Sequence, residues 1–507
     1  MNILKNITYT LTIFSTSLYS LSIDELKDMP KSRERDFYIW KFLKEPTTTK
    51  ELAIEASSLI FHKNRKLDNA FFKKSGVHLP KRVYKPKKVD LSKYTKLISS
   101  LYKSGDFYKA WLKLSTHDKL IVFAHGGKEV RKILNEKIDE KLYQEFQKDR
   151  LINQLIYRAK RENLTHLKEL IENTKPVDGN KIRYKTLMKL AYKYLLNGDK
   201  EKASWFFGGA RYNAPTRFYA DNAIFWQYMT TKDKKYLVKL SKSYDYNIYK
   251  LYALDLLNKP YPTPPNLNIM NNKANIDITD PIAWARLKEK IFSKKTNLFA
   301  LASKYNSTET SAYYYYIMNK AYKDTKQFFP IPYKDILKNY PVDRQALILA
   351  IARQESQFIP ASVSISFAVG MMQFMPFLVK EVSKKRKESV ELEEMFKPRV
   401  ALKFANTHLD YLNKHLYHPL FVAYAYNAGI GFTRKLIRNK KFFKNGEYEP
   451  FLSIEMVKND EARYYAKRVL GNYVIYKKLL GSPVKITTLL NQLDKPHLTD
   501  RFRKKTK

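Results

Sequence analysis

The chain has 507 residues, no cysteine, and 94 Lys and Arg against 49 Asp and Glu, which gives a formal net charge of +45. The absence of cysteine excludes disulfides, thiolate metal sites, cysteine nucleophiles and an acylated N-terminal cysteine. The basic residues are spread along the chain without zinc-finger spacing, an RNP-like aromatic strand or a basic region leading into heptads, and this pattern argues against a nucleic-acid-binding protein.

Residues 1–22 have the layout of a secretory signal peptide. Lys5 precedes an uncharged, mostly apolar and hydroxylic run from Ile7 to Leu21, and Ser20-Leu21-Ser22 offers a small-residue cleavage site. The run is short and contains several Thr and Ser, so export with cleavage is favoured over the alternative of a membrane anchor. We expect an exported protein without a stable anchor. Its diffuse charge suits an anionic envelope polymer or membrane surface, the alternative being a Lys-rich composition without a function.

Residues 23–265 have the pattern of an α-helical superhelix. Short amphipathic segments rich in Tyr, Phe, Leu and Ala alternate with Gly-Asp turns. Two of these turns, Gly105-Asp106 and Gly198-Asp199, each precede a helical pattern that contains a tryptophan, at Trp111 and Trp205. This weak internal similarity is typical of helix-turn-helix repeats. We expect the aromatic side chains to pack between helices rather than to form a ligand surface.

Two proline-rich stretches divide the rest of the chain. Pro260–Pro265, followed by a polar segment to Asp280, cannot continue a helix, and Phe328–Tyr333 interrupts the helical pattern again. We therefore predict a linker domain over 266–328 and a compact domain over 329–507. The expected fold class is all-α throughout.

A carboxylate on the apolar face of a helix is the main chemical signal in the last segment. Asp343 is expected to cap this helix, and Leu347, Ile351 and Glu355 then follow at i, i+4 and i+8 on the buried stripe. Removal from water raises the pKa of a carboxyl group, so Glu355 is a candidate general acid near neutral pH. The alternative is a glutamate that reaches solvent or pairs with Arg353.

Three further motifs follow, namely Gly370-Met-Met-Gln373, Ala425-Tyr-Asn-Ala-Gly429 and Glu461-Ala-Arg-Tyr-Tyr465. Gln373 and Asn427 are amides that donate and accept hydrogen bonds, and Tyr426 adds a phenol, so these side chains suit the binding of sugars. Taken singly, Met372 as core filler, Asn427 as a helix cap and Tyr426 as a core residue are the favoured interpretations.

In this order and spacing, the three motifs and Glu355-Ser356 resemble the catalytic domain of the lytic transglycosylases, which have a goose-type lysozyme fold. Phe329–Tyr333 and Ala350–Ser356 are similar to the soluble periplasmic branch, the soluble lytic murein transglycosylases, which carry a helical superhelix, a linker domain and a C-terminal lysozyme-like domain. The resemblance covers nearly all of the mature chain and is specific from about Phe329 to Tyr476. Ile365 and Phe367 stand where the family usually has Pro and Gly.

The resemblance implies a periplasmic enzyme that cleaves the β-1,4 bond between MurNAc and GlcNAc in peptidoglycan without water and leaves 1,6-anhydro-MurNAc ends. It implies that Glu355 is the catalytic residue, acting first as an acid and then as a base. Substrate-binding or supporting roles are implied for Ser356, Ser364, Met372, Gln373, Tyr426, Asn427, Glu461 and Tyr465. The superhelix would contact peptidoglycan strands and other cell-wall enzymes.

Two alternative functions keep the same fold. A hydrolytic muramidase needs two carboxylates, but no Asp or Glu occurs between Ser356 and Lys380, which leaves only the distant Glu461 as a candidate partner of Glu355. A wall-binding scaffold with an idle catalytic domain is the second alternative. It is disfavoured because the chain keeps four motif side chains together: Glu355, Gln373, Tyr426 and Asn427.

Three histidines form the only candidate metal cluster. His408, His415 and His418 are predicted to share a face of one helix at i, i+7 and i+10. These separations exceed one helical turn and no carboxylate completes the set, so we expect no metal ion, and no other cofactor is implied.

Overall fold

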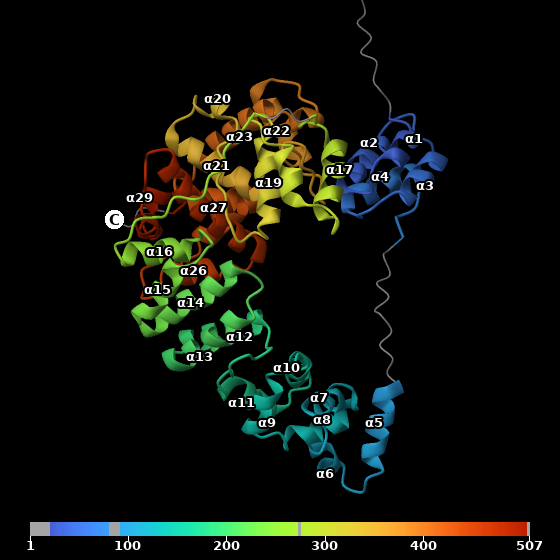
Figure 1. The fold of residues 1–507 in the computed structure, drawn as a ribbon, viewed down its shortest axis with the longest axis vertical. Coiled ribbons are helices and arrows are strands. Elements are labelled where there is room, and N and C mark those ends of the chain that lie inside the picture. Colours follow the sequence, from blue (N-terminus) through green and yellow to red (C-terminus); the bar gives the residue numbers. More distant parts are fainter. Residues whose placement is uncertain (1–20, 81–91, 272–274, 504–507) are drawn as a thin grey trace, which may run out of the picture. The chain divides into compact units, whose positions relative to one another are not determined.

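The structure is a computed structural model that describes residues 21–80, 92–271 and 275–503 (Figure 1). Every regular element in this part of the chain is a helix, which confirms the predicted all-α class. Residues 1–20, which hold most of the predicted signal peptide, lie outside the described residues. Among the residues described, none of the helices has both the length and the apolar composition that a membrane span requires.

The chain folds into two compact units, each built from segments that are separated in sequence. Unit one contains the described residues before Arg82, together with Asn275–Asn297 and Ile359–Ala401. Unit two contains Val83–Ala274, Leu298–Phe358 and Leu402–Lys507, as far as these are described. The predicted domain boundaries after residues 265 and 328 stay predictions, because units of this kind do not correspond one to one with consecutive stretches of sequence.

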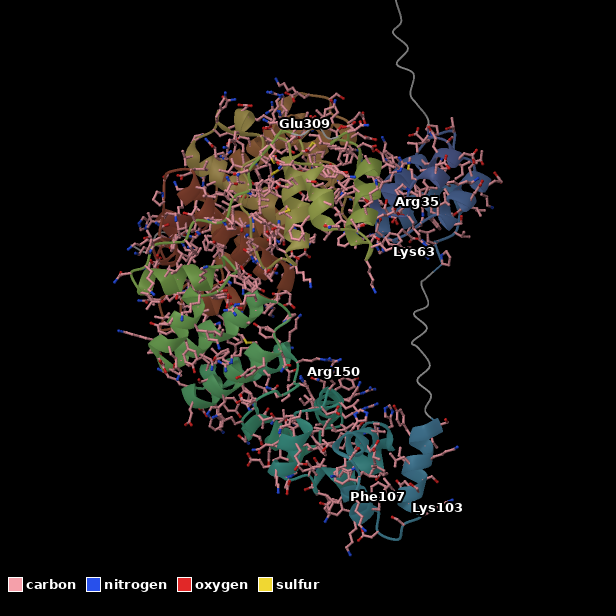
Figure 2. The ribbon with its side chains drawn as sticks, in the orientation of Figure 1. Arg35, Lys63, Lys103, Phe107, Arg150 and Glu309 are labelled. Atoms are coloured by element: carbon pink, nitrogen blue, oxygen red, sulfur yellow. The ribbon has the colours of Figure 1, made fainter. Side chains whose placement is uncertain are left out.

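The helices of unit one are α1 (Ile23–Asp28), α2 (Arg33–Phe42), α3 (Lys50–Ser58), α4 (Arg65–Ser75), α17 (Pro281–Phe292), α22 (Pro376–Arg386) and the 3-10 helix η1 (Leu392–Phe396). Helix α2 is central, since it packs against α1, α4 and α17. Arg35 of α2 donates hydrogen bonds to the carbonyls of Met29 and Leu59, and Lys288 of α17 pairs with the buried Glu34 of α2 at 2.6 Å (Figure 2).

Unit two begins with α5 (Ser92–Tyr102), α6 (Phe107–Leu112), α7 (Thr116–His125), α8 (Gly127–Asn135), α9 (Glu140–Phe146), α10 (Ile152–Arg161), α11 (Thr165–Asn173), α12 (Tyr184–Leu196), α13 (Lys200–Tyr212), α14 (Arg217–Thr231), α15 (Lys234–Ser241) and α16 (Ile248–Leu256). From α12 to α16 each helix packs against the next, as expected of a superhelix (Figure 1). The described residues between Leu256 and Pro281 contain no helix, which agrees with the proline-rich pattern there.

The remaining helices of unit two are α18 (Leu298–Ser303), α19 (Ser311–Ala321), α20 (Lys334–Leu337), α21 (Val342–Glu355), α23 (Pro398–Asn413), which starts in unit one, α24 (Pro419–Ala428), α25 (Ile430–Ile437), α26 (Phe451–Glu455), α27 (Asp460–Leu479), α28 (Ile486–Leu490) and α29 (Pro496–Thr499). The long helix α27 is the centre of this group, because α21, α24 and α16 all pack against it.

A buried polar cluster joins α27 to the superhelix within unit two. Lys467 of α27 donates to Glu455 of α26 at 2.8 Å and to the hydroxyl of Tyr249 of α16 at 3.0 Å. The Tyr249 hydroxyl in turn donates to Glu455 at 2.8 Å. The charged side chains of the pair are only 3% and 5% exposed, so each charge depends on its partner for compensation.

We predict that Lys467→Met destabilises the protein by about 3–5 kcal/mol, because the substitution leaves the carboxylate of Glu455 buried without a cation. The double variant Glu455→Leu/Lys467→Met is expected to recover most of that loss, since no charge stays behind. Urea unfolding of the wild type and of both variants measures the difference. Equal stability of the single and double variants would contradict this account of the cluster.

Candidate active site

Helix α21 carries the candidate acid at its last residue. The helix starts directly after Pro341, whose carbonyl accepts the first helical bond from the N–H of Gln345 at 3.0 Å. The predicted N-cap role of Asp343 is wrong, because its carboxylate lies in the first turn and accepts bonds from Lys477 and Tyr473 of α27. Leu347 and Ile351 are buried, as the apolar stripe predicts.

Within the described residues, the side chain of Glu355 is hydrogen-bonded to the hydroxyl of Tyr465 on α27, which donates to its Oε1 at 2.7 Å. Burial raises the pKa of the Glu355 carboxyl to about 7. The bond from Tyr465 opposes this increase in the pKa, whereas the nearby charge of Glu461 adds to it. The group is therefore poised to release and accept a proton near neutral pH, as the sequence pattern predicts.

The alternative in which Arg353 neutralises Glu355 does not apply. The guanidinium of Arg353 donates to the carbonyl of Phe328 at 3.1 Å and to Oδ1 of Asn472 at 2.8 Å, and it stacks over the ring of Phe329 at 3.9 Å. These contacts attach α21 to Phe328 and Phe329 and to α27. Ser356 ends α21, and its N–H donates to the carbonyl of Ala352 at 3.1 Å.

Tyr426 and Asn427 lie at the end of α24, which packs on the same helix α27. Gly429 ends α24 with a φ of +88°, a conformation that favours glycine. Both Tyr426 and Asn427 are partly buried, and the ring of His408 lies edge-on to that of Tyr426 at 5.5 Å. Burial, and next the charge of Glu355, raise the pKa of Tyr426 well above its ordinary value. Its hydroxyl therefore stays protonated and able to donate.

Six of the nine predicted site residues lie in unit two. Tyr465 contacts Glu355 directly, the charge of Glu355 raises the pKa of Tyr426, and the charge of Glu461 raises the pKa of Glu355. Ser356 and Asn427 are the chain neighbours of Glu355 and Tyr426. Tyr465 was expected to bind substrate, but its observed partner is the candidate acid. Glu461 is exposed in the first turn of α27 and forms no ion pair among the described residues.

The other three predicted residues lie in unit one, on the motif loop, which we define as residues 359–375. Ser364 accepts the N–H of Ala368 through its hydroxyl at 2.9 Å, and Gln373 donates through its amide to the carbonyls of Ser362 and Gly370. Met372 is fully buried. In this structure, the three side chains therefore hold the loop in shape.

Gly370 is the one position of the motif loop where the backbone demands glycine. Its φ is +79°, and a Cβ atom there would lie 2.2 Å from the carbonyl oxygen of Met395. A side chain would push η1 away from the loop. The glycine of the Gly-Met-Met-Gln motif is therefore explained by close backbone approach.

The N-terminal helices hold the motif loop from outside, a contact that the sequence did not predict. Phe367 is buried with a φ of +60°, and its ring lies 5.3 Å from that of Trp40 and 6.0 Å from that of Phe37. Asn64 donates to the carbonyl of Ile365 and Lys66 to that of Ser366, each at 2.7 Å. Phe367 was the sequence signal for this contact, because an aromatic residue in a left-handed backbone conformation needs neighbouring side chains that stabilise it.

The prediction that the three histidines share a face of one helix is wrong. Helix α23 ends at Asn413, so His408 lies on α23, His415 follows it, and His418 caps α24. His418 is buried, with Nε2 donating to the carbonyl of Leu489 at 2.9 Å and Nδ1 accepting from the N–H of Leu420 at 3.1 Å. Across the described residues, no three His, Asp or Glu side chains come together as a metal site would require.

Residues 335–448, which include Glu355 and Tyr426, match the family model of the transglycosylase SLT domain. The soluble lytic murein transglycosylase of Escherichia coli strain K12 is 28% identical over 218 residues, which are 41% of this chain and 32% of that protein. Its counterpart in Salmonella typhimurium strain LT2 is 27% identical over 214 residues with the same coverage. The matched part therefore spans about a third of the length of these relatives.

Two solved structures are similar to the chain over a longer range. The 70 kDa soluble lytic transglycosylase of Escherichia coli aligns with a TM-score of 0.45 and 17% identity, over 93% of this chain and 84% of that one. An inactive mutant of the lytic transglycosylase Slt from Pseudomonas aeruginosa aligns with a TM-score of 0.43 and 18% identity, over 90% and 74%. Because both scores are below 0.5, the assignment depends on the SLT domain match.

We predict that Tyr465→Phe raises the pKa of Glu355, because the lost hydroxyl stabilises the charged carboxylate. NMR titration of the Glu355 carboxyl carbon measures the change. Tyr464→Phe is the matched control, since the Tyr464 hydroxyl accepts a hydrogen bond from Arg468 at 3.0 Å instead of contacting Glu355. A pKa that stays the same or decreases in Tyr465→Phe would show that this bond does not tune the acid.

We predict that Lys66→Met speeds amide hydrogen exchange in the motif loop, because the bond to the carbonyl of Ser366 is lost while the aliphatic stem remains. The affected amides are those of Phe367 and Ala368. Lys63→Met is the control, since Lys63 is exposed in the same segment (Figure 2). Unchanged exchange in Lys66→Met would mean that the aromatic contacts alone hold the loop.

Proposed function

We propose that this protein is a peptidoglycan lytic transglycosylase that cleaves the MurNAc-GlcNAc bond without water and leaves 1,6-anhydro-MurNAc ends. The observation that carries the proposal is the raised pKa of the Glu355 carboxyl. This residue lies at the end of α21, within the residues that match the SLT domain. The soluble lytic murein transglycosylases that match this region support the substrate class.

The chemistry needs one carboxyl group that acts twice. Glu355 donates its proton to the glycosidic oxygen as the bond from that oxygen to C1 of MurNAc breaks. The resulting carboxylate then takes the proton of the MurNAc 6-hydroxyl while the 6-oxygen forms a bond to C1. The proton returns to Glu355, no water enters the product, and no second carboxylate is required.

The hydrolytic alternative would need a base on the opposite side of the sugar. The charge of Glu461 raises the pKa of Glu355, and the Glu461 side chain is exposed in the first turn of α27. We assign it a supporting role, in which its charge keeps Glu355 protonated to higher pH. Mass spectrometry separates the alternatives, because hydrolysis gives reducing MurNAc ends and the proposed reaction gives anhydro ends.

The remaining assignments follow from the resemblance and belong to this proposal. Tyr426 and Asn427 bind the glycan near the acid, together with the motif-loop residues Ser364, Met372 and Gln373. The superhelix over residues 23–265 binds the polymer and other cell-wall enzymes, and residues 266–328 and 329–507 are the linker and catalytic domains. Export and removal of residues 1–22 place the enzyme in the periplasm.

We predict that Glu355→Gln reduces the rate of glycan cleavage by at least about a hundredfold, because the amide keeps the shape of the side chain but cannot transfer a proton. Purified sacculi are the substrate, and circular dichroism checks the fold. Glu381→Gln, a charge removal at an exposed site of α22, is the control and is expected to keep full activity. Activity of folded Glu355→Gln near that of the control would refute the assignment.

The pH dependence follows from the raised pKa of Glu355. The first step uses the protonated form, which predominates below about pH 7 and is lost as the pH increases through that value. We therefore predict that kcat/KM decreases above about pH 7. In Tyr465→Phe, this decrease is expected to occur at higher pH. A decrease of kcat/KM centred near pH 4.5 instead would show that the Glu355 carboxyl has an ordinary pKa.

A further inference from the structure

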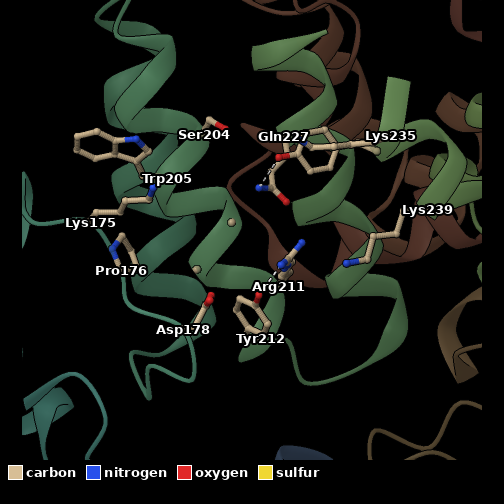
Figure 3. A pocket seen from close by; sticks show the side chains of 13 residues that line it. Lys175, Pro176, Asp178, Ser204, Trp205, Arg211, Tyr212, Gln227, Lys235 and Lys239 are labelled. Carbon is tan, nitrogen blue, oxygen red and sulfur yellow. Dashed lines mark hydrogen bonds between the residues drawn. The ribbon is translucent and has the colours of Figure 1, made fainter. Parts of the chain in front are cut away.

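A cavity of about 500 Å³ lies in the superhelix of unit two, away from every site residue discussed above (Figure 3). It is formed by α13, α14, α15 and the segment before α12. Its polar and aromatic lining includes Lys175, Asp178, Trp205, Arg211, Tyr212, Gln227, Lys235, Tyr236 and Lys239. The volume falls in the range of small-ligand pockets.

The position of Trp205 at the cavity follows from its spacing after the helix cap. Asp106 and Asp199 cap their helices in the same way, each accepting the N–H three residues later, at 3.0 and 2.9 Å. Trp111 follows its cap by five residues and is fully buried, whereas Trp205 follows by six and lines the cavity. One residue turns a side chain by about 100° around a helix, which is enough to move the second indole from the core to the surface.

Positive charge in the cavity exceeds negative charge. Four basic side chains and one carboxylate, Asp178, line it. Lys235 is paired with Asp233 at 2.7 Å, but Arg211 and Lys239 form no ion pair within the described residues. Burial, followed by repulsion from Arg211 and Arg217, lowers the pKa of Lys239. An anion in the cavity would relieve this repulsion.

Two buried polar atoms at the cavity have no hydrogen-bond partner within the part of the chain that the structure describes. Gln227 is 94% buried, as 6% of its surface is exposed, and its Oε1 has no hydrogen-bond partner, while its Nε2 donates to Tyr236 at 3.3 Å. Nε of Arg211 is also buried and unpartnered, although its guanidinium stacks on Tyr212 at 4.5 Å. Such atoms are costly in a folded protein unless a ligand or water satisfies them.

Two glycines of α13 allow neighbouring residues to pack closely against this helix at the cavity. A Cβ atom at Gly209 would lie 2.5 Å from the ring of Pro176, and one at Gly208 would lie 2.9 Å from the amide of Gln227. The pair of glycines on α13 therefore lets Pro176 and Gln227 approach the helix. Trp205 lies beside Lys175, and Tyr212 lies beside Arg211 (Figure 3).

We propose that this cavity is a second binding site, which takes a carboxylate-bearing peptide, specifically the acidic stem peptide of peptidoglycan. Arg211 and Lys239 bind the carboxylate, Gln227 accepts a backbone N–H of the peptide, and Trp205 packs against its apolar part. The choice of peptide rests on the proposed function, whereas the anion site itself rests on the lining residues. The site would hold the polymer by its peptides while the SLT domain acts on the glycan.

The test is isothermal titration calorimetry of the full chain with an isolated stem tetrapeptide that has free carboxylates. This peptide has no glycosidic bond, so its binding cannot depend on Glu355. We expect Lys239→Gln to weaken binding roughly tenfold, because a charged hydrogen bond is lost. Lys189→Gln removes one charge from an exposed position of α12 and is expected to bind like the wild type. The same tetrapeptide with amidated carboxylates should bind roughly tenfold more weakly to the wild type.

A second measurement locates the peptide without relying on a substitution of the basic groups. The indole N–H signal of Trp205, assigned by its absence in Trp205→Phe, should shift on addition of the peptide. Equal binding by Lys239→Gln and Lys189→Gln, or equal binding of the amidated peptide, would overturn the proposal. So would binding of inorganic phosphate or phosphatidylglycerol vesicles through Lys239 in the absence of peptide binding, since the site would then recognise phosphate. Loss of activity in Glu355→Gln leaves these outcomes unaffected.

Discussion

The half-buried carboxyl group of Glu355 is hydrogen-bonded to the hydroxyl of Tyr465, and the packing of the helices around it fixes that contact. The charged form of this carboxyl group is disfavoured by desolvation and by the nearby charge of Glu461. Both effects favour the protonated acid, whereas the bond from Tyr465 favours the anion. The balance puts the pKa of Glu355 at about 7, and a proton can then move in either direction during one reaction cycle.

Helix α27 positions the partner of Glu355 and, through other side chains, also contacts the superhelix. Tyr465 points to α21, while Lys467, two residues later, enters the buried cluster with Glu455 and Tyr249. Arg468 of the same helix pairs with Asp245 near the start of α16 at 2.9 Å. The superhelix and the helix that orients the acid are therefore one packed body. Loss of the buried charge pair would affect the position of Tyr465 as well as stability.

The motif loop depends on a different part of the chain. Trp40 and Phe37 retain the ring of Phe367 in a left-handed conformation that would cost roughly 1–2 kcal/mol by itself, and Lys66 holds the adjacent carbonyl. Residues 329–507 taken alone would lack these partners. The departures from the family pattern at Ile365 and Phe367 thus have a physical explanation, since the substituted residues are anchored by the N-terminal helices.

The all-α class, the apolar stripe that leads to Glu355, the glycine of the motif loop and the helix breaks around Pro260–Pro265 were predictable from the sequence, because each depends on local periodicity or on backbone conformation. Three features could be known only from the packed fold: Tyr465 is the partner of Glu355, Asp343 binds α27 instead of capping α21, and the three histidines lie on separate elements. The position of Trp205 at a basic cavity also required the neighbouring helices. These contacts join residues up to hundreds of positions apart, and their pairing is set by the packing of whole helices, which no local pattern records.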